Sequence, residues 1–406
     1  MAYGTKCGES ITDIFISDQD LVDSLTIGYM NSTGLYYLSN ISCICGLLNR
    51  DWLTNGGDCV EQVFRGSTGC HAAFLRSYDT VSNRYRLVMS GKNDHGQLGT
   101  FSTSWSSAMV GPIDCADFSH AATGSSHTAG VKVDGSLWTW GRNNHFQLGV
   151  TNTISRSSPI QVSASGWKKV AAGEFSTFAI TANNSLYAWG KSDHGQTGIP
   201  SVTDATVSTP TLVGSNFKCV SAGGDYAIAL KTDNTLWAWG FNNDGRLGLG
   251  DTISRSSPVQ ICAGKQWKKI TAGYMQAAAI DMDNNLYVWG CNVCANLGLG
   301  TTIAQRVSCP VQIGCSVAWR DITINCHIGA GISTEGKLYL WGNNTCSLLP
   351  SPESGLYCVP TLSKLPDYYT TTSGNCSGAT GCSFCTRESV TATDKTLYIL
   401  SQSSYI

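Results

Sequence analysis

The sequence predicts an all-β fold assembled from a repeat of about 50 residues. A short apolar and aromatic segment, usually followed by glycine, occurs eight times along the 406 residues. The segments end at Ser39, Ser90, Trp140, Trp189, Trp239, Trp289, Trp341 and Ser401, at intervals of 51, 50, 49, 50, 50, 52 and 60 residues. The chain also contains 44 glycines. Short strands that alternate with glycine-rich turns at this period are typical of β-propeller blades.

One repeat can be divided into four strands. Residues 258–261 form the first, and its proline, which lacks an N–H, suits a strand start or an outer edge. Residues 267–273 form the second, and the small apolar residues 277–280 are expected to form a crowded inner strand. A turn at 283–285, rich in Asp and Asn, leads to the aromatic strand 286–289. Each unit therefore predicts a four-stranded antiparallel blade.

The chain is predicted to be a single domain over residues 1–406. The repeats are regular over 60–362, whereas 1–59 and 363–406 are degenerate. We expect these ends to close the ring, with an N-terminal strand near Ile11 completing the blade that the C-terminus builds. Closure would remove two exposed sheet edges.

The repeat resembles the regulator of chromosome condensation repeat. Residues 124–128 (Gly-Ser-Ser-His-Thr), 134–141 (Asp-Gly-Ser-Leu-Trp-Thr-Trp-Gly) and 147–149 (Gln-Leu-Gly) carry the likeness. The resemblance implies a closed propeller of seven blades, while the eight aromatic strands favour eight, so both numbers stay open. Members of that family include an exchange factor for a small GTPase that binds chromatin, parts of ubiquitin ligases and bacterial protein inhibitors. They share a rigid disc whose loops bind macromolecules.

The composition of the chain limits the classes of partner that we expect. Charged residues make up 13% of the chain and the net charge is −2, with no basic tail or Lys/Arg run, so we expect no nucleic-acid binding. No apolar run of about 18 residues occurs, so no membrane insertion is expected. The polar N-terminus does not look like a signal peptide.

Cysteine is unusually frequent, with 18 residues in the chain. Either the protein reaches an oxidising place, such as the surface of a virus particle, or the thiols are small buried hydrophobic groups. Metal binding by the two Cys-x-x-Cys motifs is a third, weaker alternative. The ten candidate disulfide cysteines crowd the last third of the chain: Cys291, Cys294, Cys309, Cys315, Cys326, Cys346, Cys358, Cys376, Cys382 and Cys385.

The turn that follows each Ala-Gly pair is the candidate binding site. Equivalent positions in a propeller lie on one face, so these turns would form an arc of aromatic and acidic side chains, which protein interfaces favour. Packing of Phe175 and Tyr226 as caps on the core is the alternative. The predicted contact residues are Glu174, Phe175, Asp225, Tyr226, Tyr274, Met275 and His327.

The loop after each Trp-Gly pair carries a second series, His95, His145, His194, Asp244, Cys294 and Cys346. A metal ring is not expected there. Equivalent atoms of neighbouring blades should lie on the order of 10 Å apart, whereas Zn²⁺ ligands lie at about 2.0–2.3 Å. No nucleophile–base order or phosphate-binding loop stands out, so we predict no enzyme and no cofactor.

These observations predict a non-enzymatic propeller scaffold for protein or receptor recognition. Cysteine content and low charge favour a structural or host-recognition component of a virus or phage particle, at the virion surface or otherwise extracellular. Its partners would be other particle subunits or a host-surface receptor, bound through the face loops. The alternatives are a cytoplasmic exchange factor or regulator of a small GTPase, and a secreted inhibitor or adhesin.

Overall fold

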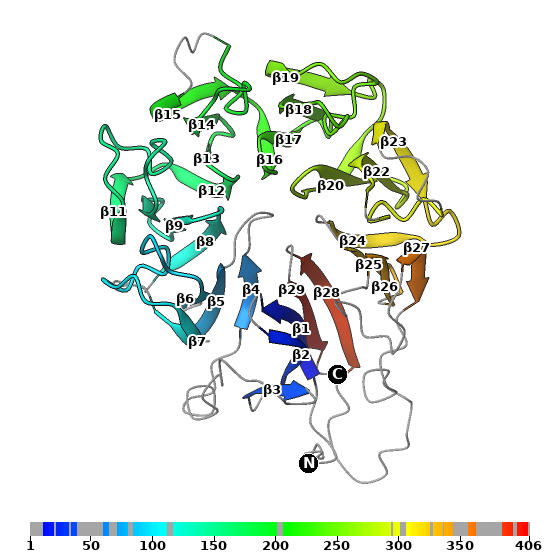
Figure 1. The fold of residues 1–406 in the computed structure, drawn as a ribbon, viewed down its shortest axis with the longest axis horizontal. Coiled ribbons are helices and arrows are strands. Elements are labelled where there is room, and N and C mark those ends of the chain that lie inside the picture. The colour runs from blue at the N-terminus through cyan, green and yellow to red at the C-terminus, as the bar shows by residue number, and fades with distance from the viewer. Residues whose placement is uncertain are drawn as a thin grey trace.

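The computed structural model describes residues 11–19, 22–31, 34–38, 60–64, 71–79, 84–111, 117–200, 206–293, 295–300, 306–324, 328–335, 337–343, 356–362, 384–392 and 396–404. Within these ranges the strands form seven antiparallel sheets, which stand around a common centre as the blades of a propeller (Figure 1). Six sheets have four strands and one has five.

The blades are numbered here along the chain. Blade 1 contains β1 (Ile11–Gln19), β2 (Val22–Asn31), β3 (Gly34–Leu38), β28 (Phe384–Ala392) and β29 (Thr396–Ser404). Blade 2 contains β4 (Val60–Phe64), β5 (His71–Asp79), β6 (Arg84–Gly91) and β7 (Ser106–Val110). Blade 3 contains β8 (Phe118–Thr123), β9 (His127–Lys132), β10 (Leu137–Gly141) and β11 (Arg156–Ser163).

The remaining four blades follow the same order. Blade 4 contains β12 (Trp167–Ala172), β13 (Ser176–Thr181), β14 (Leu186–Lys191) and β15 (Thr206–Gly214). Blade 5 contains β16 (Phe217–Ala222), β17 (Tyr226–Lys231), β18 (Leu236–Gly240) and β19 (Arg255–Ile261). Blade 6 contains β20 (Trp267–Ala272), β21 (Gln276–Asp281), β22 (Leu286–Cys291) and β23 (Arg306–Ile313). Blade 7 contains β24 (Trp319–Ile324), β25 (Ile328–Ser333), β26 (Leu338–Asn343) and β27 (Leu356–Leu362).

The two ends of the chain share blade 1, as predicted. Strand β1 pairs antiparallel with β29, from Asp13 opposite Leu400 to Ser17 opposite Thr396. This sharing also explains the count of eight. The first and last aromatic segments are β3 and β29 of the same sheet, so eight segments make seven blades among the described residues.

The innermost strand of a regular blade is the first one, not the alanine-rich one. Strands β8, β12, β16, β20 and β24 lie nearest the centre (Figure 1). Residues 277–280 belong to β21, the second strand of blade 6, which is an inner strand between β20 and β22, as predicted. Ala277 and Ala279 pack in a cluster with Tyr226 of blade 5, while Ala278 and Ile280 pack with Trp319 of blade 7. Small side chains let both neighbouring blades approach this strand closely.

The third strand of each regular blade clamps the blade before it. Its buried tryptophan donates the indole N–H to a backbone carbonyl in the preceding blade's long loop: Trp140 to Gln97 (2.8 Å), Trp189 to Gln147 (2.9 Å), Trp239 to Gln196 (3.0 Å), Trp289 to Arg246 (2.9 Å) and Trp341 to Asn296 (2.8 Å). Glycine is required beside the ring. Gly198 has a φ of +75°, and a Cβ added there would lie 2.9 Å from Trp239 Nε1.

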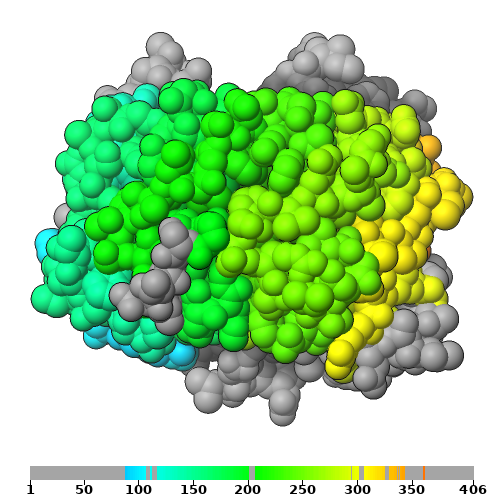
Figure 2. Space-filling model, turned by 90° about the horizontal axis from the view of Figure 1, so that it is seen from above, coloured from blue at the N-terminus to red at the C-terminus, as the bar shows by residue number. Residues whose placement is uncertain are grey.

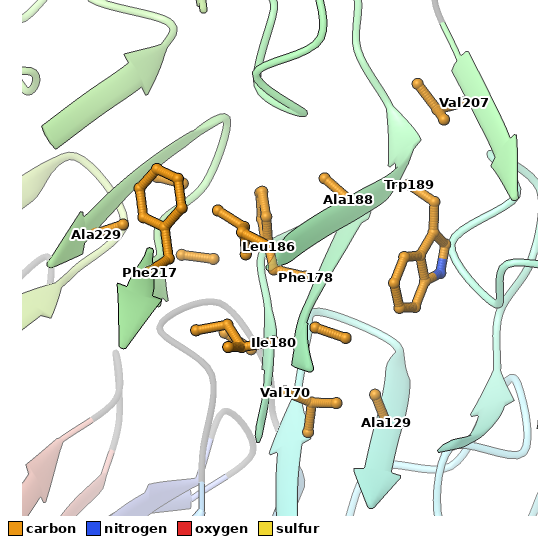
Figure 3. Close-up of a cluster of buried hydrophobic side chains, with 14 of the residues drawn as sticks. Ala129, Val170, Phe178, Ile180, Leu186, Ala188, Trp189, Val207, Phe217 and Ala229 are labelled. Atoms are coloured by element: carbon orange, nitrogen blue, oxygen red, sulfur yellow. The ribbon is translucent and has the colours of Figure 1, made fainter. Parts of the chain in front are cut away.

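The core lies between blades. Figure 3 shows Trp189 on its strand among aliphatic side chains, with Ala129 of blade 3 and Phe217 of blade 5 in the same cluster. Seen from the side, consecutive blades pack against one another without a break from cyan to yellow (Figure 2). In the described part of the chain, no helix has the length and apolar character needed to cross a membrane.

Candidate protein-binding face

Two sets of loops meet at one end of the blades. The short turn between the first and second strands is hydrogen-bonded to the start of the long loop that follows the third strand. Lys191 N–H donates to the Phe175 carbonyl (3.0 Å), and Phe241 N–H donates to the Asp225 carbonyl (2.8 Å). We call this end the loop face. It comprises the turns 173–175, 223–225 and 273–275 and the long-loop residues 142–147, 191–196 and 241–246.

The short turns of blades 4, 5 and 6 are bonded to one another. Glu174 N–H donates to the Gly224 carbonyl (3.3 Å), and Gly224 N–H donates to the Tyr274 carbonyl (3.1 Å). The Tyr274 hydroxyl also donates to Glu174 Oε2 (3.2 Å), across 100 residues of sequence. Two predicted site residues from separate repeats, Glu174 and Tyr274, are thus brought together, with Gly224 of the repeat between them.

Charges of both signs surround this junction. Burial and the neighbouring Asp225 carboxylate raise the pKa of Glu174, against the opposing effects of the Tyr274 hydrogen bond and nearby Lys191. Lys191 forms an ion pair with Asp193 at 2.9 Å. The Gln196 amide donates to Asp193 (2.9 Å) and to Asp225 (3.2 Å), which ties a long loop of blade 4 to a turn of blade 5.

Phe175 is one of the half-buried aromatic residues of this face. Its ring centroid lies 5.1 Å from that of His145, which belongs to the long loop of blade 3. The Arg142 guanidinium carbon lies 5.5 Å and the Lys191 ammonium 5.7 Å from the Phe175 centroid, both within reach of a cation–π interaction. The ring is therefore held in a defined position while part of it faces solvent.

Tyr226 belongs to the core, as the packing alternative predicted. It opens strand β17, in register with the strand-opening residues His127, Ser176 and Gln276, and all four are buried. Tyr226 is 1% exposed and donates its hydroxyl to the Gly273 carbonyl at 3.2 Å. The sequence assignment was one residue out of frame, so the turn positions of blade 5 are Gly224 and Asp225.

The other predicted contact residues differ in burial and in location. Tyr274 and Met275 are half-buried in the turn of blade 6, whereas His327 lies outside the described residues. In the second series, His194 stacks against Phe241, with centroids 4.6 Å apart, and Asp244 forms an ion pair with Arg246. Among the described residues, no group of three or more His, Cys, Asp or Glu side chains could hold a metal ion.

Three candidate disulfide cysteines have free thiols: Cys291, which is buried, and Cys309 and Cys315, which are exposed. The disulfide prediction is therefore not supported at these positions. Cys294, Cys326, Cys346, Cys376 and Cys382 lie outside the described residues, and of Cys358 and Cys385 only the backbone is described.

Sequence reasoning missed Arg142, Lys191 and Gln196 as members of the face. Their signal was positional, since each lies at the end of a third strand or in the long loop that follows it, and this loop packs against a neighbouring short turn. The complete face presents carboxylates, cations, an amide and aromatic rings on hydrogen-bonded turns. Such a surface can bind a macromolecule by shape, apolar contact and paired charges.

A match to a known family model identifies the family of this chain. The model of the RCC1-like domain matches residues 56–385. The chain belongs to the RCC1-like family. Among curated relatives it is 34% identical over 83 residues to the probable E3 ubiquitin-protein ligase HERC3 of Homo sapiens, covering 20% of this chain and 8% of that protein. It is 30% identical over 147 residues to the ultraviolet-B receptor UVR8 of Arabidopsis thaliana, covering 36% of this chain and 29% of that protein.

Solved structures share the fold. Yeast RCC1 (Prp20), in a complex with Kap60, superposes with a TM-score of 0.73 at 16% identity and covers 98% of this chain and 90% of that one. Human WBSCR16 gives a TM-score of 0.70 at 16% identity and covers 97% of this chain and 99% of that one. The chain is thus an RCC1-like propeller along most of its length, whereas it matches less than a third of HERC3 or UVR8.

Proposed function

We propose that this RCC1-like propeller is a non-catalytic module that binds a protein partner through its loop face. The observation that carries the proposal is the junction of Glu174, Phe175 and Tyr274, where a half-exposed aromatic ring sits among hydrogen-bonded turns of three blades. Preorganised turns need little ordering when a partner binds, which favours affinity.

The chemistry of the face suits a protein better than a polyanion. Arg142 and Lys191 are balanced by Asp193, Asp225 and Glu174, so both signs of charge are present. Aromatic and arginine side chains are enriched at the energetic centres of protein interfaces. Yeast Prp20p, with the same fold, has been studied for binding to Gsp1p and histones, and it forms a complex with Kap60. These proteins support a protein as the class of partner.

Regulation of a small GTPase is the second candidate. It rests on the family, which includes an exchange factor, and on a fold shared with yeast RCC1 over 98% of the chain. The test is release of labelled nucleotide from a panel of small GTPases. Acceleration by catalytic amounts of this protein would establish exchange activity, and no acceleration at micromolar protein would dismiss it.

A place at the virion surface or elsewhere outside the cell remains a proposal based on cysteine content. The free thiols of Cys291, Cys309 and Cys315 remove part of its support. Mass spectrometry of the native protein, with and without reduction, would count the disulfides. A fully reduced native protein would leave this proposal without its main argument.

The binding proposal is tested with a matched pair of variants. Phe175→Ala removes the aromatic group of the loop face, and Leu212→Ala removes an apolar side chain, 54% exposed, from the fourth strand of the same blade. Affinity purification from the source organism, followed by mass spectrometry, should recover a partner with the wild type and with Leu212→Ala but lose it with Phe175→Ala. Equal recovery with all three would contradict the proposed site.

A further inference from the structure

A row of cations lies at the end of the ring opposite the loop face. The innermost strands begin at that end and run toward the loop face, and in four consecutive blades their second residue is basic. We call Lys168 of β12, Lys218 of β16, Lys268 of β20 and Arg320 of β24 the basic belt. Lys168 is exposed and the other three are half-buried, so the belt remains accessible to solvent.

The three lysines of the belt are positioned by neutral groups. Each donates to the side-chain oxygen of an asparagine in its own blade: Lys168 to Asn184 (3.4 Å), Lys218 to Asn234, and Lys268 to Asn284. An amide oxygen accepts a hydrogen bond without cancelling the charge. The ammonium groups are therefore held in place while their positive charges stay uncompensated by these contacts.

The same asparagines connect the belt from blade to blade. Their backbone carbonyls accept the N–H of the first residue of the next innermost strand: Asn184 from Phe217 (2.9 Å), Asn234 from Trp267 (2.9 Å) and Asn284 from Trp319 (2.8 Å). Lys218, Lys268 and Arg320 each directly follow one of these anchored residues. Lys168 follows Trp167, whose N–H donates in the equivalent way to the Gly135 carbonyl (3.0 Å). The spacing of the cations is thus fixed by the backbone.

The residues next to the belt add charge. Lys169 donates to the Lys218 carbonyl (3.4 Å), again a neutral acceptor, while Lys269 forms an ion pair with Asp321 at 2.5 Å. Asp281, the other nearby buried carboxylate, pairs with Lys265 at 3.0 Å. Of the belt and its two neighbouring lysines, only Lys269 is neutralised by an ion pair among the described residues.

Arg320 supplies a second, independent observation. Its Nε and Nη2 atoms are buried and have no hydrogen-bond partner among the residues that the structure describes. Buried guanidinium nitrogens normally find acceptors, and leaving them unmet is unfavourable. A shift of the half-buried Arg320 side chain toward solvent would let one planar carboxylate accept hydrogen bonds from both nitrogens.

We propose that the basic belt binds an acidic segment of a protein, rich in Asp and Glu. Three of its four members are lysines, which attract carboxylates as point charges, and Arg320, once its side chain shifts toward solvent, can donate two hydrogen bonds to one carboxylate. The belt holds four cations and the whole chain has a net charge of −2, which favours a short acidic peptide over a nucleic acid, whose binding draws on many cations at once. This surface is separate from the loop face, so its test does not depend on the function proposed above.

The test uses fluorescence anisotropy with a labelled decaglutamate peptide at low ionic strength. The triple variant K168Q/K218Q/K268Q should raise the Kd at least about tenfold, and rising salt should abolish the difference. The control K92Q/R156Q/R306Q makes the same change in net charge at the opposite, loop-face ends of blades 2, 3 and 6 and should shift the Kd by no more than about twofold. Arg320→Gln alone should weaken binding at an unchanged Tm.

Several results would overturn the proposal. The wild type could fail to bind the peptide, or the control triple could lose as much affinity as the belt triple, which would indicate bulk charge. Tighter binding of an oligothymidylate of equal charge through the same lysines would assign the belt to nucleic acid instead. Near-equal Tm values for the wild type and both triples ensure that a loss of affinity reports the belt and not unfolding.

Discussion

The inter-blade tryptophan clamp can be tested at Trp239, where one hydrogen bond has no substitute. In blades 3 and 4, a threonine hydroxyl shares the clamped carbonyl, as Thr177 does for the Gln147 carbonyl at 2.7 Å. Blade 5 has Ala227 at that position. Trp239 therefore makes the single side-chain hydrogen bond to the Gln196 carbonyl found among the described residues.

Trp239→Phe should destabilise the protein by about 3–5 kcal/mol. The lost hydrogen bond accounts for about 1 kcal/mol, the buried carbonyl left without a donor for about 1–3 kcal/mol, and the missing ring atoms for the rest. Trp189→Phe should destabilise by about 2–3 kcal/mol, because Thr177 still donates to its carbonyl. Trp237→Phe should cost about 1 kcal/mol, since this half-buried indole bonds only the Thr235 hydroxyl of its own blade (2.8 Å).

The assay is equilibrium unfolding in urea, followed by tryptophan fluorescence and by circular dichroism, with the free energy of unfolding extrapolated to water. Trp239→Phe should be the least stable variant and Trp237→Phe the most stable. If Trp189→Phe proved as damaging as Trp239→Phe, the shared threonine would have no stabilising role. If Trp237→Phe matched Trp239→Phe, the clamp between blades would not be the source of the loss.

Three further outcomes follow from buried groups. Burial lowers the pKa of His127 to about 3 from its ordinary 6.5, so the stability that the neutral ring allows is complete above pH 6.5 and falls as the pH drops toward 3. By pH 5 the free energy of unfolding from urea titrations should fall by about 2 kcal/mol, and His127→Gln should lack this part of the loss. Gly240→Ala should destabilise the protein by about 2–4 kcal/mol and weaken partner binding, because the residue has φ +104° and its Cβ would lie 2.6 Å from the Asp225 carbonyl oxygen. The control Gly264→Ala, at φ +91° with no atom within 4 Å of the added Cβ, should destabilise by only about 1 kcal/mol in thermal unfolding. Tyr226→Phe should lower stability by about 1–3 kcal/mol yet leave the Kd for the partner unchanged, and an altered Kd with unchanged stability would return Tyr226 to the contact surface.

The sequence was enough to predict the repeat, four strands per blade and the shared terminal blade, but it grouped 258–261 with 267–289, whereas 258–261 lies in β19, the last strand of blade 5. Those features depend on periodic side chains such as Trp239 and on the glycines beside them, which any copy of the blade needs. The blade number was harder, because β3 and β29 both carry the aromatic pattern but lie in one sheet. Pattern alone does not reveal which strands pair across the two ends of a chain.

The loop face could be predicted only in part. The turn positions at Glu174 and Tyr274 were found from their place in the repeat, but a one-residue slip put the buried Tyr226 among them. Arg142 and Lys191 were missed because they reach Phe175 from loops that belong to other positions of the repeat. Contacts between loops depend on blade packing, which a single repeat does not encode.

The basic belt escaped detection for a different reason. Its members lie 50, 50 and 52 residues apart, so no basic run appears in the sequence. Only the ring brings Lys168, Lys218, Lys268 and Arg320 to one end of neighbouring strands. The cysteine content pointed toward disulfides, yet three of the candidate residues are free thiols in a protein whose blades are already held by buried tryptophans.

The most direct test of the central claim is the affinity of the purified partner for the wild type, Phe175→Ala and Leu212→Ala, measured by isothermal titration calorimetry. Loss of a central aromatic contact should raise the Kd of Phe175→Ala by about 30-fold or more, or about 2 kcal/mol, while Leu212→Ala should bind like the wild type. Equal Kd values for the wild type and Phe175→Ala, with a loss confined to Leu212→Ala, would place the partner on the outer strands and contradict binding through the loop face.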